Sequence, residues 1–129
     1  MFSALLSDRR GAAAVEFALV LPLLMMLVFG AVEFGRMFWI KNSIQFAVEE
    51  AGRFAMVNTD ATTGELEAYA ESRIFGMDPT DITFSVTAES FGGTDFMSIA
   101  GTYEFVTLIP LVPIDPIDLD AKSRVPLVN

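Results

Sequence analysis

The sequence predicts an α+β protein in which one long N-terminal helix carries a short helix and a small antiparallel sheet. Three observations lead to this prediction. An apolar run begins at residue 12, a heptad-like apolar stripe continues it to residue 54, and strand-like alternation appears only after residue 80. Because a helix hides one apolar stripe and a sheet hides one apolar face, we expect the two to pack on each other.

The composition indicates two unlike parts. The 129 residues are 53% hydrophobic and carry a formal net charge of −9, whereas soluble domains are usually about 45–50% apolar. Residues 1–57 hold five acidic and five basic side chains, which gives zero. Residues 58–129 hold twelve acidic and three basic side chains, which gives −9. The chain therefore divides into a neutral apolar stalk and an acidic head (residues 58–129).

Two residue types are missing, and their absence excludes several kinds of chemistry. The chain has no Cys and no His, which excludes disulfides, thiol catalysis, and imidazole bases or metal ligands. The acidic balance argues against binding nucleic acid through its phosphates. No phosphate loop or serine-nucleophile motif is present. We therefore expect neither a catalytic residue nor a cofactor.

The apolar run at residues 12–32 contains one charged side chain, Glu16. Its 21 residues span about 31 Å as a helix, which matches the roughly 30 Å hydrocarbon core of a bilayer. We predict a membrane-spanning segment over 12–36 and an exposed extension of the same helix over 37–57. Pro22 should kink the membrane half, because proline removes a helical hydrogen bond.

Three kinds of N-terminal apolar segment have to be separated. A secretory signal peptide has a shorter apolar core followed by small residues at its cleavage site, and this chain has neither. An uncleaved single-pass anchor stays open. In the third kind, cleavage precedes the apolar run and the helix is kept. Cleavage between Gly11 and Ala12 would create an α-amino group, and Glu16 lies four positions along the same helical face.

Four features of residues 9–56 form a recognisable pattern: RRG followed by AAAVEF, Pro22, EFGR at 33–36 and EAGR at 50–53. With these features the segment resembles TadE-like pseudopilins, which are minor pilins of the tight-adherence (Tad, type IVc) pilus system.

That resemblance implies a leader peptide over residues 1–11, which a prepilin peptidase removes after Gly11. It also implies that Glu16 and Phe17 act in processing or subunit assembly. The mature chain would keep 129 − 11 = 118 residues, which favours a pseudopilin over the short major pilin. The choice between a TadE-like and a TadF-like type stays open.

The resemblance also implies a location and partners. We expect a single pass through the bacterial inner membrane, with the head in the periplasm, and membrane lipid as one partner. The other expected partners are the prepilin peptidase, further pilins or pseudopilins, and the Tad assembly platform. Incorporation into an extracellular pilus stays open. The rival interpretation is an uncleaved single-pass subunit of another envelope complex.

Beyond the membrane segment, apolar residues recur at spacings of three and four and form a stripe on one helical face. The members of the stripe are Met37, Ile40, Ile44, Ala47, Ala51 and Phe54. We predict that this face packs on the head, with a partner helix as the alternative. Glu49 and Arg53 are predicted to form an i,i+4 ion pair.

The head should contain one short helix and three strands. Thr62 and Glu65 form a capping-box pattern, which predicts a helix over 65–75. Alternation predicts strands over 82–87, 96–108 and 119–125, with a turn at Gly92-Gly93 and an edge strand that Pro126 stops.

Three acidic residues near the end of the chain are the remaining candidates for chemistry: Asp115, Asp118 and Asp120. A weak calcium site is one interpretation, because calcium takes carboxylate oxygens. A solvated acidic edge that blocks strand pairing is the favoured one. An envelope enzyme that uses these residues is the most remote.

Overall fold

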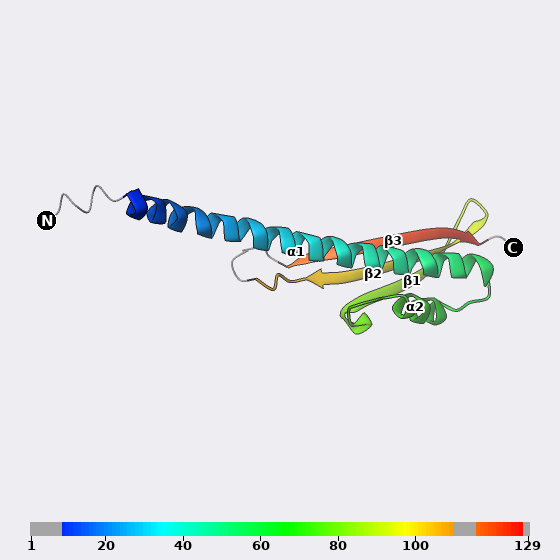
Figure 1. The fold of residues 1–129 in the computed structure, drawn as a ribbon. Coiled ribbons are helices and arrows are strands. Elements are labelled where there is room, and N and C mark those ends of the chain that lie inside the picture. Colours follow the sequence, from blue (N-terminus) through cyan, green and yellow to red (C-terminus); the bar gives the residue numbers. More distant parts are fainter. Residues whose placement is uncertain (1–8, 110–115, 128–129) are drawn as a thin grey trace.

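The computed structural model describes residues 9–109 and 116–127, with the side chains of residues 9 and 10 excepted. It contains the elements α1 (Arg9–Val57), α2 (Thr63–Ser72), the 3-10 turn η1 (Pro79–Asp81), β1 (Ile82–Phe91), β2 (Thr94–Phe105) and β3 (Ile117–Leu127). Figure 1 shows α1 as a long rod whose second half lies along the sheet and α2, while its first half extends beyond them. The predicted α+β class is confirmed.

Helix α1 is 49 residues long, or about 73 Å at the usual rise per residue. It is helical without interruption through Pro22, and a kink there stays a prediction. Among the described residues, α1 is the one helix long and apolar enough to cross a membrane, and none of its most apolar 18-residue window is buried. Its N-terminal half therefore has no protein core of its own.

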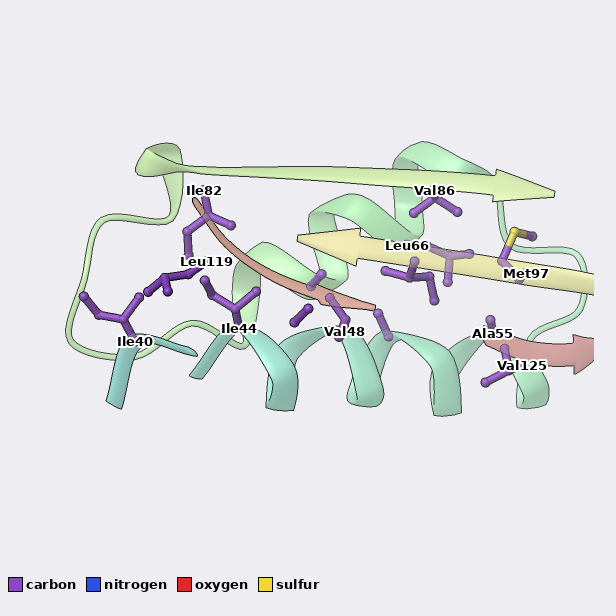
Figure 2. Packing of buried hydrophobic residues seen from close by; sticks show 14 of the residues in the cluster. Ile40, Ile44, Val48, Ala55, Leu66, Ile82, Val86, Met97, Leu119 and Val125 are labelled. Carbon is purple, nitrogen blue, oxygen red and sulfur yellow. The ribbon is translucent and has the colours of Figure 1, made fainter. Parts of the chain in front are cut away.

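The second half of α1 forms the floor of the head core. The predicted stripe has four buried members: Ile40, Ile44, Ala47 and Ala51. Its first and last members, Met37 and Phe54, are half-buried. Figure 2 shows the side chains of α1 facing those of α2 and the strands. The stripe thus packs on the chain's own head, as predicted.

The predicted Glu49–Arg53 ion pair on α1 is wrong, because Arg53 pairs with Glu50 instead. Arg53 Nη1 lies 2.7 Å from Glu50 Oε1, at i,i+3, while Glu49 Oε1 accepts a hydrogen bond from Gln45 Nε2 at 2.6 Å. Two carboxylates, three and four residues before Arg53, compete for one guanidinium, and Glu49 has an alternative donor.

The sheet is antiparallel with the strand order β1-β2-β3. The turn between β1 and β2 is formed by Gly92 and Gly93, whose φ angles are 61° and 80°. Two consecutive residues with positive φ are what the favoured two-residue hairpin turn requires. At the outer edge of β1, the Glu67 carboxylate of α2 accepts the Val86 backbone N–H at 3.2 Å, which covers part of that edge.

Several predicted strand ends were wrong. Strand β1 continues to Phe91 rather than ending at residue 87, and β2 and β3 each begin two residues earlier than predicted. Strand β3 does not stop at Pro126, which pairs with Phe96 inside the strand. An edge strand tolerates proline because one of its sides needs no ladder hydrogen bond. Strand β2 ends at Phe105 rather than at residue 108, because the following residues leave the sheet and contact α1.

The capping box of α2 is confirmed. Thr62 Oγ1 accepts the Glu65 backbone N–H at 3.3 Å, and Glu65 Oε2 accepts the Thr62 backbone N–H at 2.8 Å. That backbone hydrogen bond, together with one from the Thr62 hydroxyl, lowers the pKa of the Glu65 carboxyl from its ordinary value. The helix ends at Ser72, three residues before the predicted end.

The sheet approaches α1 closely where glycine leaves room. A Cβ at Gly101 of β2 would lie 2.7 Å from Ile44 Cγ2 of α1 and 2.9 Å from Phe84 Cε1 of β1. A Cβ at Gly52 of α1 would lie 2.9 Å from Ser123 Oγ of β3. The packing distance between helix and sheet therefore depends on one glycine from each side.

We expect Gly101→Ala to destabilise the head by about 1–3 kcal/mol, because the added methyl group has to displace Ile44 or Phe84. Gly64→Ala is the matched control. A Cβ there meets nothing within 4 Å, and alanine favours a helix over glycine by about 1 kcal/mol. Urea unfolding of the full chain in detergent micelles, followed by near-UV circular dichroism, measures both. Wild-type stability of Gly101→Ala would contradict the close approach.

Candidate functional site

The predicted processing residues lie at the free end of α1. Gly11, Ala12, Glu16 and Phe17 are all helical and exposed. Nothing lies within 4 Å of a Cβ at Gly11. Ala12 and Glu16, four residues apart, share one helical face as expected. The structure keeps these residues together on one helix end, and their roles in cleavage and assembly stay predictions.

A second site is centred on Glu33, to which the sequence analysis gave no role. This side chain is only 4% exposed, although it directly follows the exposed apolar run. Its Oε1 accepts the backbone N–H groups of Leu108 at 2.8 Å and of Ile109 at 3.1 Å. Its Oε2 accepts two hydrogen bonds from Arg36, from Nη2 at 2.9 Å and from Nε at 3.1 Å.

Arg36 joins the same segment from the other side. Its Nη2 also donates to the backbone carbonyl oxygen of Val106, and its guanidinium lies 4.2 Å above the ring centre of Phe105. Together, the hydrogen bonds of Glu33 and Arg36 hold the segment that follows β2 against α1. We call residues 106–109 the basal loop. The Glu33 clamp is the set of contacts that Glu33 and Arg36 make with this loop and with Phe105.

The local sequence explains why the Glu33 clamp forms. Glu33 is seven residues, or about two helical turns, before Ile40, so it continues the face that packs on the head. Arg36 is three residues further on, where helical side chains are neighbours. The basal loop leaves the sheet, so its backbone N–H groups need other acceptors. Burial of the Glu33 charge is tolerated because both of its oxygens are paired.

The signal that could have revealed Glu33 is its position in the stripe. Glu33 occupies a position where the apolar stripe would continue, and an opposite charge follows at i+3. Such a pattern indicates that the charged side chain is buried and has a partner on the packed face of the helix. The EFGR segment was noted for its resemblance to a family. Its contact with residues 75 positions away has no signature in the local sequence.

The acidic candidates of the head form no metal centre among the described residues. Within those ranges, no group of three or more acidic side chains is placed to hold a metal ion. Asp118 and Asp120 are exposed on β3, where Asp118 lies opposite Glu104. Asp115 lies outside the described residues.

Comparison with known families bears on both sites. Residues 11–53 match a family described as TadE-like protein, which confirms the resemblance. The match includes Gly11, Glu16 and both charged residues of the Glu33 clamp, and it ends before the head. Neither the curated proteins nor the solved structures gave a match.

We expect Glu33→Ala to release the basal loop from α1, because it removes the acceptor of two backbone N–H groups and leaves Arg36 half-buried without its carboxylate. Amide hydrogen exchange at Leu108 and Ile109 should accelerate by about tenfold or more. Glu50→Ala is the matched control, since Glu50 also pairs with an arginine at i,i+3 but is not hydrogen-bonded to the basal loop. Unchanged protection at both amides in Glu33→Ala would contradict the role of the clamp.

Proposed function

We propose that this TadE-like chain is a pseudopilin, a non-catalytic minor component of Tad pilus assembly that a prepilin peptidase processes after Gly11. The observation that carries the proposal is the unburied apolar half of α1, which extends beyond the head and carries Gly11, Ala12 and Glu16 near its end. A helix that is apolar all round needs lipid or other helices around it. A pilin helix meets lipid before assembly and neighbouring helices after it.

The place of Gly11 favours cleavage. The Gly11–Ala12 bond lies in the first turn of α1, and helix ends open more easily than helix interiors. Glycine in a helix costs about 1 kcal/mol relative to alanine, so this turn is easily drawn out into the extended form that a peptidase binds. The exposure of the site leaves room for the enzyme.

The charge of Glu16 supports a role in subunit assembly for the N-terminal end of α1. Glu16 is the one charged side chain of the apolar run, and a carboxylate near the centre of a bilayer costs about 2.5–3.5 kcal/mol on insertion scales. Cleavage would place an α-amino group four residues away on the same face. The amine of the same subunit, or that of a neighbouring subunit, would then pair with Glu16 as helices gather.

The proposed location follows from the same helix. Residues 12–36 cross the inner membrane once, and residues 37–57 project with the acidic head into the periplasm. The leader, which contains Arg9 and Arg10, stays on the cytoplasmic side. The proposed partners are membrane lipid, the prepilin peptidase, other pilins or pseudopilins and the Tad assembly platform.

We expect the native chain to begin at Ala12 when it is produced with an active prepilin peptidase. Intact-mass and N-terminal analysis should show the loss of residues 1–11, and Gly11→Val should abolish that loss because a peptidase pocket fitted to glycine has no room for a branched side chain. Gly30→Val, at a second open helical glycine, should be cleaved normally. An intact Met1 beside active peptidase would instead support the uncleaved anchor.

We expect Glu16→Ala to keep membrane insertion but to lower incorporation into the pilus machinery by about tenfold or more, since a buried amine would lose its partner. Co-purification with the assembled pilus parts measures incorporation, and membrane fractionation measures insertion. Glu49→Ala, on the exposed face of the same helix, is the control. Incorporation of Glu16→Ala at the wild-type level would refute this role of Glu16.

A further inference from the structure

We propose that the base of the head rests on the bilayer, and that the basal loop inserts its apolar side chains among the lipids at the membrane surface. This proposal rests on the proposed function only in requiring that α1 spans a membrane. It assigns a lipid-binding surface to residues outside that helix.

The basal loop exposes apolar side chains while three of its backbone groups are paired by the Glu33 clamp. Leu108 is 75% exposed and Val106 is 53% exposed. The backbone N–H groups of Leu108 and Ile109 are both taken up by Glu33, and the carbonyl oxygen of Val106 is taken up by Arg36. Unpaired backbone groups are the main obstacle to placing a loop in an apolar medium. The Glu33 clamp removes this obstacle at three groups of the basal loop.

The Glu33 clamp also fixes the depth of the basal loop. Residues 12–32 of α1 suffice to cross the hydrocarbon core, about 31 Å against about 30 Å. Glu33 is the next residue, and it holds Leu108 and Ile109 directly. When residues 12–32 lie in the bilayer, the basal loop lies at the boundary between hydrocarbon and headgroups. No rearrangement of the head is needed to bring it there.

Neighbouring side chains fit the same boundary. Phe34 and Phe38 of α1 are both exposed, with ring centres 5.3 Å apart, and aromatic side chains favour the membrane interface. Within the Glu33 clamp the two charges cancel. Glu104 and Asp118, opposite each other at the end of the sheet, would lie just above the loop, in water. This arrangement favours a zwitterionic over an anionic lipid surface.

The absence of cysteine allows a direct test. Three single-cysteine variants of the full chain, Leu108→Cys, Phe91→Cys and Leu24→Cys, would each carry a nitroxide label in phosphatidylcholine nanodiscs. Phe91 is the matched control, because it is also 75% exposed but lies beside the hairpin turn at the other end of the sheet. Leu24 lies in the apolar run and reports on the insertion of α1. The measurement is the accessibility of each label to oxygen, which enters lipid, and to a water-soluble nickel complex.

The label at position 108 should show a several-fold higher ratio of oxygen to nickel accessibility than the label at position 91. If position 24 reads as lipid and position 108 reads as water, the basal loop does not bind the bilayer, and the membrane anchor stands. If position 24 also reads as water, the anchor itself fails, and the proposed function fails with it. Shielding of position 108 from both reagents would show a protein contact, such as a second copy, and would overturn the proposal.

Discussion

The head depends on one packing interaction, that of the apolar sheet face against residues 40–55 of α1. The sheet has three strands, and the 72 residues after α1 are too few to bury a large core on their own. Buried residues of α1, among them Ile44 and Val48, complete that core. Under the proposed function, the same helix contacts lipid along one half and a protein interior along the other, and Glu33 lies at the change between the two.

Glu33 shows how a charge can serve such a boundary. A buried carboxylate is costly unless its oxygens are paired, and here Arg36 and two backbone amides pair both of them. Together, Glu33 and Arg36 pair three backbone groups of the basal loop where it leaves the sheet. The Glu33 carboxylate thus lies at the edge of the protein core. The exposed apolar side chains of the basal loop, Val106 and Leu108, lie beside it and face the proposed membrane.

The features that the sequence predicted correctly are those that depend on near neighbours. The stripe on α1, the capping box at Thr62 and Glu65, and the hairpin at Gly92-Gly93 all follow from spacing and backbone preference. Some errors are local, such as the ion pair that Arg53 forms with Glu50 instead of Glu49. The error at the end of β2 and the missed role of Glu33 depend on distant partners. Strand β3 passes Pro126 because it is an edge strand, and the end of β2 is set by Glu33 on α1. The motif around Gly11 is readable from the sequence, but its chemistry requires an enzyme and neighbouring subunits that one chain does not contain.

Because α1 is one continuous helix, a small change in its direction near one end displaces its other end by a much larger distance. From Glu33 to Ala55 the helix is joined to the head by the Glu33 clamp and by the shared core. Below it, Pro22 lacks a backbone N–H group, so the continuous helix has one hydrogen bond fewer there. A tilt of about 10° at Pro22 would displace the far end of α1, roughly 50 Å away, by about 9 Å. A small motion in the proposed membrane-spanning half of α1 would thus displace the hairpin tip over a much larger distance.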